Sequence, residues 1–212
     1  MAILRAVGDT VKYEMRILGC RLQIGRVLGL EIVIALWVGA SCTTGALAQS
    51  REASEYQVKA AFLYNFAKFV EWPPDPSSDL SDPITICVIG HDPFGTVLDE
   101  AVRGKTVSGH RLVIRRSKPG QSWTGCQIAF ISSAEGKDLP SILESSKGSG
   151  VLTVGEMEGF AQRGGMINFV IEQERVHFEV NVEAAERAGL KISSKLLSLA
   201  KIVREQDHGK KT

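Results

Sequence analysis

Histidine and cysteine are the residues of this chain with the widest chemical repertoire, and their spacing limits what they can do. The four histidines are His91, His110, His177 and His208. No two of them stand at a metal-ligand spacing, and neither an HExxH nor a CxxC pattern occurs. A GxSxG nucleophile motif and a Walker A motif are also missing. We therefore expect neither a metal nor another cofactor, and a protein that binds rather than catalyses.

The N-terminal residues 1–48 have the layout of a secretory signal peptide. Basic residues are spread over residues 1–26, and the apolar run 32–40 follows. Ala46-Leu47-Ala48 then offers small side chains at the −3 and −1 positions of a signal-peptidase site. The run is shorter than the roughly 20 apolar residues that span a bilayer, and an uncleaved anchor is the alternative. We predict export with residues 1–48 removed; Met15 is an alternative start to Met1.

The charge of the remaining chain argues against a nucleic-acid partner. Residues 1–48 hold five of the 25 basic and three of the 24 acidic residues, which leaves 20 basic against 21 acidic ones. No basic excess remains to attract a polyanion. The acidic residues are scattered, and we expect them to cap helices and to keep the surface soluble. Residues 49–205 suffice for one domain, and a disordered polar tail is expected at 206–212.

Cys87 and Cys126 are the two cysteines that remain once Cys20 and Cys42 leave with the signal peptide. An even number of cysteines in an exported protein favours a disulfide. The bridge would close a loop of about 39 residues and stabilise the fold by ~4 kcal/mol through the entropy of the unfolded chain. Two free thiols buried in apolar strands are the alternative.

An amphipathic helix at Glu55–Pro73 is expected to organise the fold. Ser54 stands at the N-cap position, with Gln57 at the spacing of a capping box. The apolar stripe consists of Val58, Phe62, Phe66 and Phe69, widened by Leu63 and Val70. Trp72-Pro73-Pro74 ends the helix, since proline cannot continue it. Three phenylalanines on one face need a broad apolar partner, and Lys59 is expected to extend its ammonium group to solvent.

Apolar runs and helical segments then alternate along the chain. The predicted strands are residues 84–89, 111–116, 127–131 and 151–154, and the predicted helices are 94–102 and 137–146. This alternation is typical of a parallel sheet with helical crossovers. The pattern changes at 166–171 and 175–180, which predict an antiparallel hairpin. We thus expect a single α/β domain with a mainly parallel sheet, flanked by helices, and a C-terminal antiparallel hairpin.

Two helices are predicted after the hairpin. Asn181 is expected to cap the first, at 182–187. Ser193 or Ser194 is expected to cap the second, which extends to Val203. Its apolar stripe consists of Leu196, Leu197, Ala200 and Val203.

Loops at the carboxyl ends of the predicted parallel strands form one candidate binding site. In open α/β sheets, ligands favour the crevice beyond these ends. The residues there are Gly90, His91, Ser132, Ser133 and Gly155. Their loops present helix N-termini and free N–H groups, which suit a small molecule. Such residues also cap helices in α/β domains that bind nothing there.

An apolar cluster around the start of the hairpin is the other candidate. It consists of Phe160, Met166, Ile167 and Phe169. Most of these side chains should belong to the core. If the hairpin lies at an edge of the sheet, one of its faces could bind another chain.

Four blocks of sequence, in this order, resemble the YfiR family of periplasmic proteins. They are YQVKAAFLYNFAKFVEWP, ITICVIGHDPFG, CQIAFIS and the segment from GFAQRGGMINFV to KISSKLLSLA. The resemblance covers about residues 55–203. It implies a dimeric α/β domain with redox-sensitive cysteines, in which Cys87 and Cys126 match one cysteine pair of the family. A second pair, found in some members in the later half of the domain, is missing here.

The resemblance also implies a function. The best-studied members repress an inner-membrane diguanylate cyclase by acting on its periplasmic region, and so restrain cyclic-di-GMP synthesis. An OmpA-like outer-membrane lipoprotein can sequester them. We therefore expect a non-enzymatic, periplasmic homodimer that represses such a cyclase and limits biofilm formation. A periplasmic small-molecule-binding protein that uses the strand-end crevice is the alternative.

Overall fold

The computed structural model describes residues 44–73, 82–121 and 124–205. The fold below is that of the unit formed by residues 45–212. The predicted signal peptide falls largely, and the predicted C-terminal tail wholly, outside the described residues. No helix in the described parts combines the length and apolar character needed to cross a membrane.

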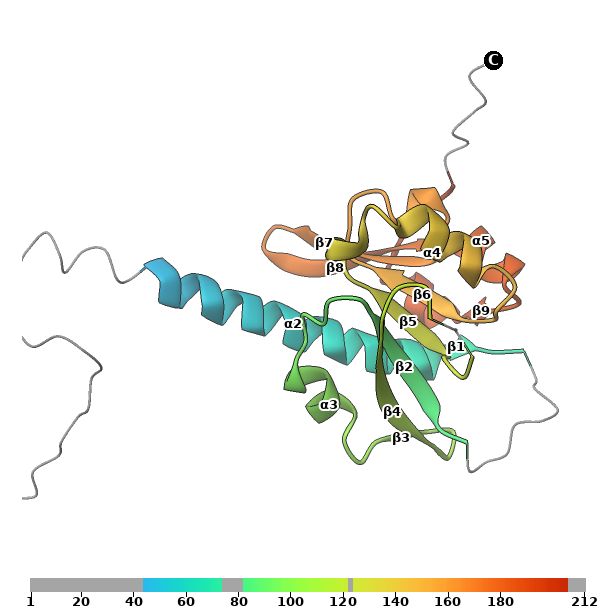
Figure 1. Ribbon diagram of the computed structural model, residues 1–212, viewed down its shortest axis with the longest axis horizontal. Helices are drawn as coiled ribbons and strands as arrows, with labels where there is room; N and C mark the ends of the chain where they lie inside the picture. The colour runs from blue at the N-terminus through green and yellow to red at the C-terminus, as the bar shows by residue number, and fades with distance from the viewer. Residues whose placement is uncertain (1–43, 74–81, 122–123, 206–212) are drawn as a thin grey trace, which may run out of the picture. The chain divides into compact units, whose positions relative to one another are not determined.

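An eight-stranded sheet runs through this unit in the order β10-β8-β7-β6-β5-β2-β4-β3 (Figure 1). Its strands are β2 (Ile84–Ile89), β3 (Thr106–Val107), β4 (His110–Ser117), β5 (Ile128–Ile131), β6 (Leu152–Gly155), β7 (Ile167–Glu172), β8 (Arg175–Asn181) and β10 (Lys201–Val203). The five central strands β4, β2, β5, β6 and β7 are parallel to one another, whereas β7–β8 and β3–β4 are antiparallel pairs. The predicted mainly parallel sheet with its C-terminal hairpin is confirmed.

The five parallel strands have the order of a doubly wound fold, in which the second strand lies on one side of the first and the third on the other. The order of the strands across the sheet therefore switches between β2 and β5: β4 is added on one side of β2, and β5, β6 and β7 are added on the other. Strand β2 is an unbroken apolar run because it is covered on both faces.

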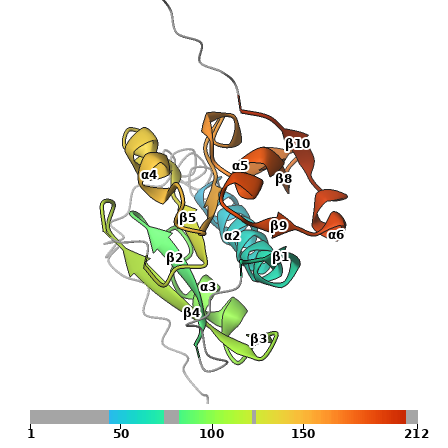
Figure 2. The same ribbon diagram turned by 90° about the vertical axis from the view of Figure 1, so that its right-hand side faces the viewer.

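Helices cover both faces of the sheet. They are α2 (Thr44–Phe69), α3 (Thr96–Val102), α4 (Leu139–Ser146), α5 (Val182–Arg187) and α6 (Ser194–Leu197), with short 3₁₀ turns η1 (Ser133–Glu135) and η2 (Ala161–Arg163). Alternate residues of β2 enter different cores: Ile86 and Val88 pack with α2 and α3, and Cys87 and Ile89 pack with α4. Figure 2 shows α2 and α4 on opposite sides of the strands.

Helix α2 is the aromatic-faced helix expected from the sequence, but both of its ends differ from the prediction. It begins at Thr44, so Ser54 lies inside it rather than at its N-cap. The residues before Ser54 include strong helix formers such as alanine, leucine and glutamine, which explains the longer helix. It ends at Phe69 because the next two residues form β1 (Val70–Glu71), which pairs with β9 (Lys191–Ile192).

The apolar stripe of α2 packs on the hairpin. Phe62 and Phe66 contact both Phe169 and Phe178, with ring centroids 5.3–6.1 Å apart. This cluster of four rings is the broad apolar partner that the stripe requires. Val58, at the other end of the stripe, is 41% exposed and does not belong to the core.

The C-terminal end of the domain differs most from expectation. Asn181 caps α5 as predicted, since its Oδ1 accepts a hydrogen bond from Ala184 N. Ser193 caps the last helix, but this helix ends at Leu197 and does not extend to Val203. Residues 201–203 instead form β10, parallel to β8. The hairpin is therefore covered by β10 and does not lie at the edge of the sheet.

Candidate functional site

A disulfide joins Cys87, in the middle of β2, to Cys126, two residues before β5. Their Cα atoms are 5.9 Å apart. The bridge confirms the pairing predicted from the cysteine count. Neighbouring parallel strands bring the two residues together, because Cys87 is paired in register with Ala129 of β5. Cys87 is fully buried and Cys126 is 6% exposed.

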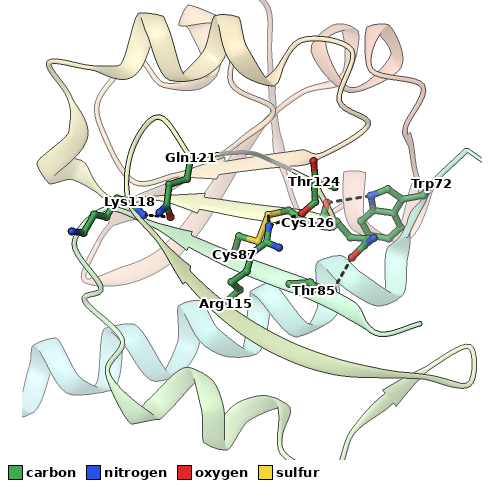
Figure 3. The surroundings of a disulfide bond; sticks show 9 residues. Trp72, Thr85, Cys87, Arg115, Lys118, Gln121, Thr124 and Cys126 are labelled. Carbon is green, nitrogen blue, oxygen red and sulfur yellow. Dashed lines mark hydrogen bonds between the residues drawn. A yellow bond between two sulfur atoms is a disulfide. The ribbon is translucent and has the colours of Figure 1, made fainter. Parts of the chain in front are cut away.

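Arg115 of β4 lies against this disulfide. Register pairing places it beside Cys87, on the other side of β2 from β5. Its Nη2 lies 2.7 Å from Sγ of Cys126 and also donates a hydrogen bond to the carbonyl oxygen of Thr124 at 2.8 Å. Figure 3 shows the Arg115 side chain alongside the bridge. The sequence offered no signal for this contact, because it depends on the register of three strands.

A cavity of about 1020 Å³ opens at the amino ends of the parallel strands. Its wall includes Trp72, His110, Cys126 and Gln127, with Lys68 from α2. Trp72 Nε1 donates to the carbonyl oxygen of Gln127 at 3.2 Å, and the Gln127 side chain accepts from Thr85 N at 2.7 Å (Figure 3). These bonds tie the residue after β1 to the starts of β2 and β5, so one wall of the cavity is fixed.

The strand-end crevice lies at the opposite, carboxyl ends of the parallel strands. The chain topology brings Gly90, Ser132 and Gly155 to the carboxyl ends of the neighbouring strands β2, β5 and β6. The protein's own groups fill the space there. The Glu135 carboxylate accepts a hydrogen bond from His91 N and lies where a side chain at Gly90 would be. Ser132 is buried and uses its hydroxyl group to cap η1.

The remaining two crevice residues have local partners as well. Ser133 Oγ donates to Glu156 Oε1 at 3.5 Å. A methyl group at Gly155 would stand 2.5 Å from Cδ2 of Phe160, so the Phe160 ring covers this strand end. The predicted residues thus lie at neighbouring strand ends, where Glu135 and Phe160 occupy the space beside Gly90 and Gly155.

A buried ion pair lies beside this crevice. Lys59, expected to reach solvent, is only 4% exposed, and its Nζ lies 2.8 Å from Oε2 of Glu156 and 2.5 Å from Oε1 of Glu55. Its ammonium group also stands 4.5 Å from the ring centroid of Tyr56, whose hydroxyl group donates to Glu156. The longer α2 places Lys59 in mid-helix against the sheet, where it needs a buried partner.

The four residues of the apolar cluster are all in the core. Phe160, Met166, Ile167 and Phe169 are each at most 5% exposed. The Phe160 ring lies between Gly155 and Gly165, at positions where a Cβ atom would clash with it. None of the four side chains is presented to a partner in this conformation.

No group of three or more histidine, cysteine, aspartate or glutamate side chains forms a possible metal site within the described ranges. The fold and site define a doubly wound α/β module with a disulfide inside its sheet. The YfiR/HmsC-like family model matches residues 56–201, which is most of the chain, and the protein therefore belongs to that family. Family membership makes it, in general terms, a periplasmic regulator of diguanylate cyclase signalling, from a regulatory and non-catalytic family.

Proposed function

We propose that this protein binds the periplasmic sensor region of an inner-membrane diguanylate cyclase and represses the enzyme. The observation that carries the proposal is the family match, which runs from residue 56, within α2, to residue 201, the first residue of β10. The protein is exported by a signal peptide at residues 1–48 and acts as a homodimer. An OmpA-like outer-membrane lipoprotein relieves repression by sequestering it.

Repression follows from differential affinity. A bound protein shifts the cyclase towards its inactive state only if it binds that state more tightly than the active one. Moving a two-state equilibrium from 1:99 to 99:1 takes a difference in affinity of about 10⁴-fold. A rigid binding module suits this task, and the disulfide and the four-ring cluster both restrain the domain.

Deletion of the gene tests the proposal. Cellular cyclic-di-GMP and biofilm formation should rise, and a plasmid copy of the gene should restore both. A copy without the codons for residues 1–48 should fail to restore them, because it stays in the cytoplasm. Unchanged cyclic-di-GMP in the deletion strain contradicts repression. Pull-down of the exported protein from membranes should recover a membrane protein with a GGDEF domain.

Small-molecule binding is a second candidate function, and the amino-end cavity is the observation that favours it. The cavity has the size of a ligand pocket and combines the indole of Trp72 with polar groups. The strand-end crevice is filled by Glu135 and Phe160 and suits a ligand less well. Amino acids, nucleotides and anions should be screened for an increase in melting temperature. Trp72→Ala should abolish any increase due to the cavity, whereas Ser133→Ala should leave it unchanged.

A further inference from the structure

We propose that Cys126 is the sulfur through which the bridge exchanges with external thiols, and that Arg115 is the positioning residue that stabilises its thiolate. Cys87 is the buried, resolving cysteine. The ligand is a thiol, such as glutathione, that enters through the amino-end cavity.

Arg115 places a charged hydrogen-bond donor against a neutral disulfide sulfur. A disulfide sulfur is neutral and a weak hydrogen-bond acceptor, yet a guanidinium nitrogen lies 2.7 Å from Sγ of Cys126. Nε of Arg115 is buried and finds no hydrogen-bond partner among the described residues. A cationic group with a spare buried donor is better matched to an anion than to a neutral sulfur. The anion that the site can produce is the thiolate of Cys126.

The second observation is that the two sulfurs differ in access. Cys126 lines the cavity of about 1020 Å³ and is 6% exposed, whereas Cys87 is 0% exposed, although both belong to the same apolar cluster beneath α4. An external thiolate must approach the sulfur that it attacks. Only the Cys126 side of the bridge borders an open space in the described structure. The apolar cluster disfavours a thiolate at either position, and Arg115 offsets this at Cys126, whose Sγ it contacts.

The exchange then follows a definite order. The external thiolate attacks Sγ of Cys126, a new sulfur–sulfur bond forms, and the old bond breaks with its electron pair on Cys87, which takes up a proton. A second external thiolate attacks the incoming sulfur of this mixed disulfide. The two external thiols leave joined as one oxidised disulfide, and Cys126 is released as a thiolate beside Arg115. Two thiols thus supply the two electrons, and the reverse sequence closes the bridge.

Single-cysteine variants test the role of each thiol. The Cys87→Ala protein leaves Cys126 as the thiol of interest, and its alkylation by iodoacetamide should be followed from pH 5 to 10. The midpoint of this profile should lie below about 8.5, the ordinary value for a free thiol. Adding Arg115→Gln should lower the alkylation rate at pH 7 about tenfold, because a nearby opposite charge typically changes the proton affinity of a group by tenfold or more. In Cys126→Ala, the Cys87 thiol should react only after unfolding in urea.

Arg116→Gln is the matched control. It removes the same charge from the adjacent position of β4, where the side chain pairs with Asp92 and Asp99 instead of the bridge. It should leave the profile of Cys126 unchanged. Equal profiles with and without Arg115, or faster alkylation of folded Cys126→Ala than of folded Cys87→Ala, would overturn the proposal. Far-UV circular dichroism should verify that each variant is folded.

A measurement on the unaltered protein avoids any loss of folding. The oxidised protein is incubated with glutathione, quenched with acid and digested, and the glutathione adduct is located by peptide mass. The adduct should be at least tenfold more abundant on Cys126 than on Cys87. An adduct mainly on Cys87, or equal adducts on both, contradicts the assignment. Absence of any adduct under conditions that reduce the bridge contradicts it as well.

Discussion

The ion pair between Lys59 and Glu156 is enclosed by protein on every side, with the two side chains 4% and 5% exposed. Removing one partner of such a pair leaves a buried charge without compensation. Lys59→Met should therefore lower the free energy of unfolding by about 3 kcal/mol or more, measured by urea denaturation. The double variant Lys59→Met/Glu156→Leu should recover most of this loss, because both members of the buried pair are then apolar and Glu55, the other partner of Lys59, is 29% exposed.

Lys68→Met is the control for this prediction. Lys68 lies on the same helix but is exposed, so its replacement should change the free energy of unfolding by less than about 0.5 kcal/mol. If Lys59→Met were as stable as Lys68→Met, the buried pair would have no structural role.

The surface pair of Arg116 and Asp99 predicts a pH dependence. The hydrogen bond from Arg116 lowers the pKa of Asp99 from its ordinary value of 3.8. A lowered pKa stabilises the fold at pH values above the unfolded pKa, and this contribution is lost as the pH falls through the folded pKa. Arg116→Gln should thus be less stable than the unaltered protein at pH 7, and the difference should shrink as the pH falls below 3.8.

The size of this effect is limited by solvent. The side chains of Arg116 and Asp99 are 42% and 40% exposed, so the difference at pH 7 should not exceed about 1 kcal/mol. Chemical denaturation at several pH values measures it. A difference that is constant from pH 7 to pH 2 would show that Asp99 is not the titrating partner.

At the scale of elements, Phe169 of β7 distinguishes core packing from partner contact. The side chain is 3% exposed and touches the rings of Phe62 and Phe66. Phe169→Ala should lower the free energy of unfolding by about 3–5 kcal/mol. Ile171, two residues on and 48% exposed, is the matched control, and Ile171→Ala should cost less than about 1 kcal/mol. A Phe169→Ala protein of normal stability would contradict the core assignment.

The elements predicted best from the sequence are those whose structure is determined by residues close to one another along the chain. The run 84–89 forms β2 with the same bounds, and α5 spans 182–187 behind the Asn181 cap. A buried apolar run and a cap each carry their own signal. The α/β class and the pairing of Cys87 with Cys126 were likewise predictable, the first from alternation and the second from the cysteine count.

The elements that sequence missed depend on distant partners. Leu196, Leu197, Ala200 and Val203 have the apolar spacing of one helix, but pairing with β8 makes residues 201–203 a strand. Strand β1 exists because Val70 pairs with Ile192, far along the chain. The same holds for the site, since Lys59 finds Glu156 97 residues away. Such contacts follow from tertiary packing, which overrides local propensity.

At the scale of the whole molecule, the export prediction has a direct test. The protein recovered from the periplasm should begin at Gln49, as determined by N-terminal sequencing or intact mass. Cleavage there falls within α2 and leaves the helix from residue 49 to Phe69, including its aromatic stripe. A protein that begins at Met1 or Met15 and stays with the membrane would support the uncleaved anchor instead.

The placement of the disulfide has a consequence for how the two layers of the molecule communicate. Cys87 projects into the core beneath α4, while its neighbours Ile86 and Val88 project into the aromatic core beneath α2. A mechanical disturbance at the sulfurs can thus reach the core beneath α2 through the main chain of β2. A one-residue shift of that strand would reverse every inward and outward position at once. Strand β2, and β5 with the same alternation of Ile128 and Phe130 against Ala129 and Ile131, therefore connect the two layers through their main chains.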